Sequence, residues 1–199
     1  MAEFIFTHLD HQAEKILFLL HGTGGDELDL LPLVETLKDS YNIVSLRGNV
    51  SENGMNRFFA RSAPGVFDQV SVQAESAKLN TFIVQWCSSH QVDTENTAYL
   101  GYSNGANMIL ATAFCYPELF TKAVLLHPML PFQPTELDLS GKEFLITLGQ
   151  NDQMISATES RAVVSTLHQL GAAVKTVSHE GGHEIRAIEL QALQEFLTT

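Results

Sequence analysis

Cysteine and positive charge are both scarce in this sequence. Two cysteines, Cys87 and Cys115, occur in 199 residues, and both lie in stretches with helical patterning. So few thiols do not form a disulfide scaffold, and we expect both to be free and buried. Lysine and arginine number 11 against 23 aspartates and glutamates, which gives a net charge of −12. Because such a chain repels phosphate groups, we expect no nucleic-acid partner.

Long apolar runs are also missing. No segment approaches the ~20 apolar residues that a membrane-spanning helix needs, and residues 1–4 lack the basic start of a secretion signal. We therefore expect a cytoplasmic protein that does not associate with membranes. The chain contains no repeat, low-complexity tract or Pro/Gly/Ser-rich linker, so residues 1–199 are predicted to form a single domain.

Apolar runs that are typical of buried strands alternate with amphipathic helical patterns along the chain. Strands are expected at 4–7, 15–20, 42–46, 97–101, 122–126, 143–148 and 174–178. Helices are expected at 29–38, 67–90, 104–116, 157–170 and 183–197. This alternation predicts an α/β fold with a mainly parallel, doubly wound sheet of about seven strands, flanked by helices.

One pentapeptide is more informative than any other segment. Gly-Tyr-Ser-Asn-Gly at 101–105 follows a strand-like stretch at 97–100 and precedes a helical stretch at 106–114. A G-x-S-x-G pentad in this context predicts a nucleophile elbow, a turn so tight that only glycine fits two residues away on either side of the serine. The turn would lift Ser103 Oγ above the sheet edge as a nucleophile.

A serine nucleophile of this kind needs an acid and then a histidine later in the chain. Asp152 lies in a loop directly after the strand-like run at 144–148, where open α/β sheets place their chemistry. His183 follows the last strand-like run, and two glycines before it allow its loop to turn back over the sheet edge. We predict His183 as general base and Asp152 as the acid that orients it. Asp138, the rival acid, precedes a strand rather than following one.

Two backbone N–H groups should complete an oxyanion hole. One belongs to Asn104, the residue after the nucleophile. The other is expected from Thr23, in the glycine-rich loop at 21–25 that follows an early strand. His21 opens the same loop and is expected to be structural, because its neighbours supply the N–H groups.

These motifs resemble the phospholipase/carboxylesterase branch of the α/β-hydrolases. Within that branch they are most similar to bacterial carboxylesterase-like hydrolases linked to quinone stress, the methylhydroquinone-inducible type. The resemblance covers most of the chain and rests on residues 20–25, 30–33, 47–50, 52–59, 101–107, 127–129, 149–152 and 182–183. It implies an α/β-hydrolase fold, a triad of Ser103, Asp152 and His183, oxyanion donors at Thr23 and Asn104, no cofactor, and a homodimer as one possible assembly.

Two connections bear on the substrate. The segment at 127–142 is too short for a helical lid, so we expect an open site that suits small soluble esters rather than a lipase activated at an oil surface. The connection at 47–66 lacks clear periodicity, and long connections of this kind are often functional. The predicted pocket residues are Met55, Phe58, Phe59, His127 and Met129, although His127 could equally hydrogen-bond at the base of its loop. Arg47, Arg57 and Arg61 are expected to be solvated or ion-paired more often than to clamp substrate.

The predicted function is a carboxylesterase-type serine hydrolase that cleaves small soluble carboxylic esters through an acyl-enzyme on Ser103. An acyl-thioesterase or a lysophospholipase-like deacylase would use the same machinery, and dienelactone-hydrolase-like lactonases usually have cysteine at this position. From a different class, a non-catalytic α/β-hydrolase could serve as a binding or sensing module. The spacing of His179 and His183 resembles that of helical zinc ligands, but the glycines between them break the helix, so no metal is expected.

Overall fold

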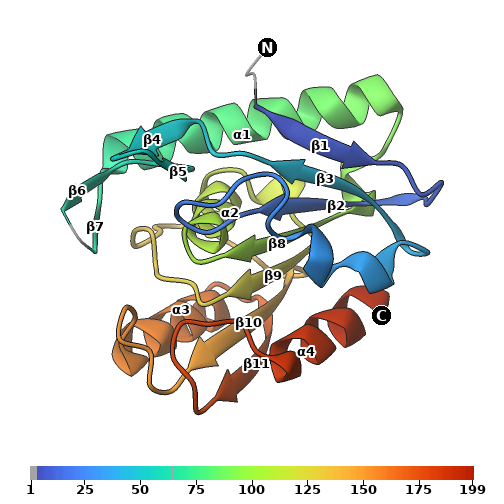
Figure 1. The fold of residues 1–199 in the computed structure, drawn as a ribbon. Helices are drawn as coiled ribbons and strands as arrows, with labels where there is room; N and C mark the ends of the chain where they lie inside the picture. The colour runs from blue at the N-terminus through green and yellow to red at the C-terminus, as the bar shows by residue number, and fades with distance from the viewer. Residues whose placement is uncertain (1–3, 64) are drawn as a thin grey trace.

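A computed structural model of the chain describes residues 4–63 and 65–199, and Figure 1 shows a central sheet with helices on both faces. Within the described residues the main sheet has seven strands in the order β1-β3-β2-β8-β9-β10-β11. They are β1 (Phe6–Leu9), β2 (Lys15–Leu20), β3 (Tyr41–Leu46), β8 (Thr97–Tyr102), β9 (Lys122–Leu126), β10 (Glu143–Gly149) and β11 (Ala173–His179). Only β1, at one edge, pairs antiparallel with its neighbour, so the predicted mainly parallel sheet is confirmed.

Helices pack on both faces of this sheet and give it two apolar layers. The layer that contains helices α1 (Gln69–His90), α2 (Asn104–Cys115) and α3 (Ala157–Gln169) lies opposite the layer with α4 (Ala187–Thr198). The side chains of β2 alternate between the two layers, with Phe18 in the first and Leu17 in the second. Because both faces are covered, such a strand reads as a continuous apolar run rather than an alternating one.

The predicted helix at 29–38 is wrong. The segment instead forms two short 3₁₀ turns, η1 (Leu31–Leu33) and η2 (Glu35–Leu37). Val34 lies between them with φ −115°, outside the helical range, and the carbonyl of Leu31 accepts from the Val34 N–H in the tighter i to i+3 pattern. The turns still bury Val34 and Leu37 against the sheet, and it is this apolar spacing that made the sequence look helical.

The connection at 47–66 contains two small hairpins, which stand together at one end of the molecule in Figure 1. One pairs β4 (Val50–Glu52) with β5 (Met55–Arg57), and the other pairs β6 (Arg61–Ala63) with β7 (Val66–Phe67). Strands of two or three residues are too short to show a period. The first hairpin nevertheless carries an Asn-Gly turn at 53–54, with φ values of 53° and 78°, which is a recognised hairpin signal. Residue 64 lies outside the described residues.

The two cysteines differ in exposure. Both are free, as expected, but only Cys87 is buried, and the prediction of a buried Cys115 is wrong. Cys115 is the last residue of α2, where that helix reaches the surface. Among the described residues, no helix combines the length and apolar character that crossing a bilayer requires. Residues 1–3, part of the segment expected to lack a secretion signal, lie outside the described residues.

The thiols should therefore react at different rates in the native protein. We expect iodoacetamide at pH 8 to alkylate Cys115 and to leave Cys87 unmodified, because burial, with the nearby Asp93 carboxylate, raises the pKa of Cys87 to about 11. Peptide mass spectrometry would locate the label, with urea-unfolded protein, in which both thiols react, as the control. Fast alkylation of Cys87 in folded protein would contradict the assigned burial.

Candidate active site

Ser103 lies at the turn between β8 and α2 and has strained backbone geometry. Its φ of 50° and ψ of −109° are unusual for any residue but glycine. A Cβ at Gly105 would collide with the carbonyl group of Leu20 in β2, and one at Gly101 would collide with the backbone of α2. The structure thus has the elbow geometry that the pentad predicts, and the Ser103 N–H donates to the Leu126 carbonyl at 2.8 Å.

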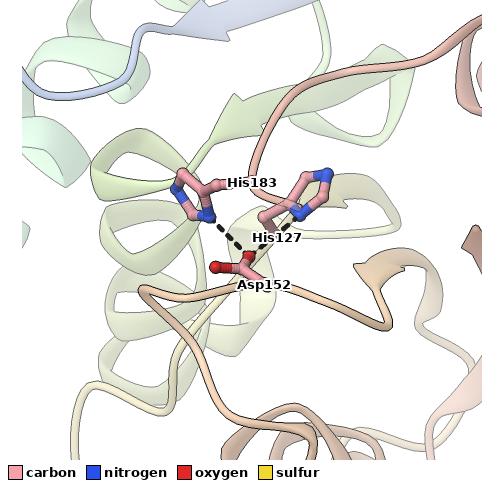
Figure 2. A group of neighbouring side chains, drawn as sticks. All are labelled: His127, Asp152 and His183. Atoms are coloured by element: carbon pink, nitrogen blue, oxygen red, sulfur yellow. Dashed lines mark hydrogen bonds and ion pairs between the residues drawn. The ribbon is translucent and has the colours of Figure 1, made fainter. Parts of the chain in front are cut away.

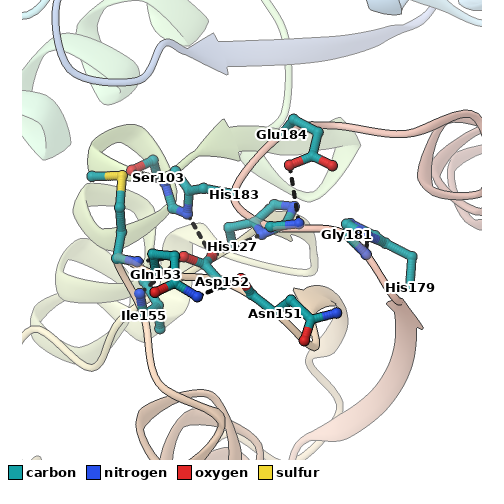
Figure 3. A network of polar contacts seen from close by, with 12 residues as sticks. Ser103, His127, Asn151, Asp152, Gln153, Ile155, His179, Gly181, His183 and Glu184 are labelled. Atoms are coloured by element: carbon teal, nitrogen blue, oxygen red, sulfur yellow. Dashed lines mark hydrogen bonds and ion pairs between the residues drawn. The ribbon is translucent and has the colours of Figure 1, made fainter.

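A continuous line of side chains links Ser103 to Asp152, as Figure 3 shows. The distance from Ser103 Oγ to His183 Nε2 is 2.9 Å. The distance from His183 Nδ1 to Asp152 Oδ2 is 2.7 Å. Asp152 follows β10, and His183 lies in the loop between β11 and α4 rather than at the start of the predicted helix, since α4 begins at Ala187. Asp138, the rival acid, is exposed and accepts from the Ser140 N–H instead.

The Asp152 carboxylate is buried, yet its surroundings favour its ionised form. Burial alone would raise the pKa of Asp152, but a hydrogen bond from His183 and the backbone N–H groups of Met154 and Ile155 together lower it below its ordinary value. Those two N–H groups donate to Oδ1 at 2.7 and 3.0 Å, which leaves Oδ2 facing His183. The arrangement holds the imidazole with Nδ1 protonated and Nε2 free to accept a proton from Ser103.

The two predicted oxyanion donors lie on either side of Ser103. Thr23 and Asn104 both line the hollow above the serine. Asn104 is the first residue of α2, so its N–H belongs to the first turn, which has no acceptor within the helix. Its side-chain oxygen accepts from the Phe58 N–H at 2.7 Å, and the Thr23 hydroxyl accepts from Arg57 Nη1 at 2.7 Å.

His21 links two segments, the loop that contains Thr23 and the start of the connection at 47–66. Its Nε2 accepts from the Gly48 N–H at 3.0 Å, so the proton lies on Nδ1, which is 2.5 Å from the Gly22 carbonyl oxygen. Burial lowers the pKa of His21, which keeps the ring neutral in this tautomer. The ring is 1% exposed, in agreement with the structural role expected from the sequence.

The predicted pocket is only partly brought together. Of the predicted residues, Met129 lines the hollow over Ser103. Phe58 and Phe59 are 1% and 0% exposed and belong to the hydrophobic core, so their assignment as pocket lining is wrong. Phe58 and Phe59 follow β5 directly, and their side chains pack into the core instead of facing the hollow. Met55 is 38% exposed and lies beside Gly24, outside the residues that line the hollow.

His127 approaches the Asp152 carboxylate beside His183 (Figure 2), and it is not among the residues that line the hollow. It is 2% exposed, so of its two expected places it takes the one at the base of its loop. Its Nδ1 is 3.4 Å from the same Asp152 oxygen that His183 approaches. Its Nε2 is 2.9 Å from Oε1 of Glu189, a carboxylate with 0% exposure in α4.

Glu189 joins His127 to a further buried histidine. Glu189 Oε2 is 3.0 Å from His179 Nε2, while His179 Nδ1 accepts from the Gly181 N–H at 2.9 Å. That last hydrogen bond fixes the proton of a neutral His179 on Nε2, the atom that faces Glu189. The side chains of His127, His179 and Glu189 are close enough to share an ion, but a His179 Nε2 that carries a proton has no lone pair to offer a metal.

Sequence reasoning missed Glu189 and Tyr102. Glu189 reads as an ordinary acid in the first turn of a helix, and nothing local reveals its approach to His127, which lies 62 residues earlier in the chain. Tyr102, the variable residue before the serine, donates its hydroxyl to the His183 carbonyl at 2.7 Å. Burial raises the pKa of Tyr102 to about 12, so the phenol stays a donor and holds the loop of His183 in place.

Removing the Glu189 charge should destabilise the fold at neutral pH. Burial would raise the pKa of Glu189, but His127, Thr147 and the backbone N–H of Arg186, the residue before α4, together lower it below its ordinary value of 4.5. Its stabilising contribution is therefore complete above pH 4.5 and is lost as the pH falls through the lower folded-state pKa. We expect Glu189→Gln to reduce the free energy of unfolding by about 3 kcal/mol at pH 7, and by less at pH 4.

Urea unfolding at both pH values measures this difference. Glu195→Gln, on the same helix, is the matched control, because the Glu195 side chain is 57% exposed and pairs with Lys175 only at 3.8 Å. We expect that control to change the free energy of unfolding by less than about 1 kcal/mol. Equal stability of the two variants at pH 7 would contradict the role assigned to Glu189.

Comparison with known proteins identifies the family of the chain. The family model for phospholipase/carboxylesterase matches residues 3–199. MhqD of Bacillus subtilis (strain 168) is 35% identical over 185 residues, which cover 92% of each chain. The Bacillus cereus carboxylesterase structure is 37% identical, covers 98% of this chain and 93% of its own, and has a TM-score of 0.91. A structure of YahD with malic acid is 28% identical, covers 98% of both chains, and has a TM-score of 0.88. The chain belongs to the phospholipase/carboxylesterase family of α/β-hydrolases.

Proposed function

We propose that this protein is a serine carboxylesterase that cleaves small soluble carboxylic esters through an acyl-enzyme on Ser103. One observation carries the proposal, namely the unbroken line from Ser103 Oγ through His183 to Asp152, with steps of 2.9 and 2.7 Å. The strained backbone at Ser103 supports it, because strain of this kind persists where the surrounding structure enforces it, often at a reacting group.

The proposed reaction has two halves. Ser103 Oγ attacks the ester carbonyl while His183 Nε2 accepts the hydroxyl proton, and the same nitrogen then protonates the departing alcohol. Water repeats the sequence on the acyl-enzyme and releases the acid. The ionised Asp152 stabilises the imidazolium form of His183 in both halves, and its lowered pKa keeps it charged at neutral pH.

The negative oxygen that forms in each half would be bound by the backbone N–H groups of Thr23 and Asn104. Both residues line the hollow that contains Ser103 and His183. The Asn104 N–H opens α2, so the helix dipole adds to its attraction for an anion. Each such donor is worth roughly 3 kcal/mol of transition-state stabilisation in serine hydrolases.

The shape of the site supports small substrates. The hollow over Ser103 has a volume of about 80 Å³. Through Gly65, Phe67 and Met129 it adjoins a second, largely apolar groove that also includes Leu130 and Phe132. The segment at 127–142 that borders both contains no helix that would cover them. An acyl chain or an aryl leaving group could extend into this groove.

Two alternatives use the same fold. An acyl-thioesterase or lysophospholipase-like deacylase would share every step with Ser103 and differ only in the leaving group. A sensing module would bind ligand without turnover, but a complete and ordered triad favours an enzyme. The relative YahD is known in a structure with malic acid, which is a dicarboxylic acid, so carboxylate-bearing esters belong in the first substrate screen.

The acyl-enzyme proposal predicts a reactive serine. We expect a fluorophosphonate probe to add once to the intact protein and not to Ser103→Ala, as read by intact-mass spectrometry. Ester hydrolysis should fall by about 10⁴-fold or more in Ser103→Ala and by at least ~10³-fold in Asp152→Asn, because His183 then lacks its partner. Ser140→Ala, an exposed serine outside the site, is the control and should keep both properties.

A folded wild-type protein that takes no adduct and hydrolyses none of the acyl, aryl or thioester probes would overturn the proposal. Tight binding of such probes without turnover would instead support the sensing module. Faster cleavage of thioesters than of matched oxygen esters would favour the thioesterase alternative.

A further inference from the structure

The charge around Ser103 is opposite in sign to the charge of the whole chain. The protein carries 23 acidic residues against 11 lysines and arginines. The hollow over the serine is nevertheless lined by two arginines and, among the described residues, by no aspartate or glutamate. Its lining consists of Thr23, Arg57, Arg61, Gly65, Phe67, Ser103, Asn104, Asn107, Met129, Met154, Ile155 and His183.

Arg57 is held almost completely out of solvent. Its side chain is 4% exposed, its Nε donates to the Phe59 carbonyl at 3.1 Å, and its Nη1 donates to the Thr23 hydroxyl at 2.7 Å. A buried guanidinium needs a counter-charge. The carboxylate that Arg57 approaches is that of Glu52, at 3.3 Å from Nε.

Glu52 does not balance Arg57 alone, because it also binds Arg61. Both Glu52 oxygens lie 3.1 Å from Arg61 Nε, and Oε1 also accepts from Arg61 Nη2 at 2.7 Å. Two guanidinium groups therefore share one carboxylate. Burial, and next the Arg61 cation, lower the pKa of Arg57, yet arginine stays protonated near neutral pH. The result is about one surplus positive charge beside the nucleophile.

Each guanidinium also has unused donors. Within residues 4–63 and 65–199, Arg57 Nη2 and Arg61 Nη1 donate no hydrogen bond to the protein. Arg57 and Arg61 line the hollow, whereas Glu52 is not among its lining residues. Planar guanidinium groups with free N–H groups match a carboxylate, which accepts two parallel hydrogen bonds.

We propose that the physiological substrate is an ester that also carries a carboxylate, which Arg57 and Arg61 bind while Ser103 attacks the ester group. The inference rests on the proposed function and adds the substrate class to it. The carboxylate belongs to the acyl part or to the leaving alcohol. Hydrolysis breaks the bond between the ester carbonyl and the alcohol oxygen and consumes one water, so the carboxylate itself is unchanged by the reaction.

Two pairs of esters test the proposal and separate the two positions of the carboxylate. For the leaving side, 4-acetoxybenzoate is compared with its neutral methyl ester. For the acyl side, mono-4-nitrophenyl adipate is compared with 4-nitrophenyl methyl adipate. The quantity measured is the ratio of kcat/KM for the anionic ester to that for its neutral partner, since changes in general activity cancel in this ratio. The proposal expects at least one ratio to depend on Arg61.

Arg61 is the position to change, because its side chain is 25% exposed and it does not touch Thr23. We expect Arg61→Gln to lower the ratio about tenfold or more, as loss of a charged hydrogen bond does. Arg61→Lys should restore most of it. Arg47→Gln is the matched control, since Arg47 pairs with Glu27 and lies outside the lining of the hollow, and it should leave the ratio as in wild type. Salt should reduce the wild-type ratio more than that of Arg61→Gln, in which only Arg57 faces the carboxylate.

Equal ratios in wild type, Arg61→Gln and Arg47→Gln, for both ester pairs, would overturn the substrate class. In that outcome continued cleavage of the neutral esters and fluorophosphonate labelling of Ser103 would leave the esterase proposal standing. Loss of labelling in wild type would instead overturn the esterase proposal itself.

Discussion

The parallel pairing of the central strands is the constraint on which the rest of the structure depends. In a parallel sheet the carboxyl ends of neighbouring strands meet at one edge. Here Thr23 follows β2, Ser103 follows β8, His127 follows β9, Asp152 follows β10 and His183 follows β11. Groups that are up to 160 residues apart in sequence therefore converge without any long connection crossing the sheet. The chemistry at this edge is a direct result of strand order.

A second, buried layer of charge holds that edge together. Asp152 faces both His183 and His127, and His127 in turn faces Glu189 of α4. Two carboxylates with almost no exposure would repel each other, and the His127 ring lies between them, with its nitrogens 3.4 Å from Asp152 Oδ2 and 2.9 Å from Glu189 Oε1. The position of Asp152 is thereby tied to α4, so the C-terminal helix contributes to the candidate site as well as to the core.

Local sequence patterns predict the features that depend on neighbouring residues, and they do not predict those that depend on contacts between distant segments. Ser103, Asp152 and His183 were predictable because each lies in a local pattern, a strand followed by a turn, whose partners come in a known order. The turns at 31–37 were taken for a helix because periods of 3.0 and 3.6 residues agree over so short a segment. Phe58 and Phe59 were misplaced because their direction depends on packing against distant elements. The contact between His127 and Glu189 joins two segments that are far apart in sequence, so no local pattern predicts it.

The first hairpin is bound to the loop of Thr23 at more than one point. The Gly24 N–H donates to the Asn56 carbonyl, and Arg57 donates to the Thr23 hydroxyl. The segment that presents positive charge to the hollow therefore also holds the backbone expected to receive the oxyanion. Substitutions in this hairpin would therefore alter substrate choice and turnover together. A change of substrate made through the hairpin would also change the rate of turnover. The apolar groove across the site shares no residue with this first hairpin, but it includes Phe67, which pairs with Arg61 in the second hairpin.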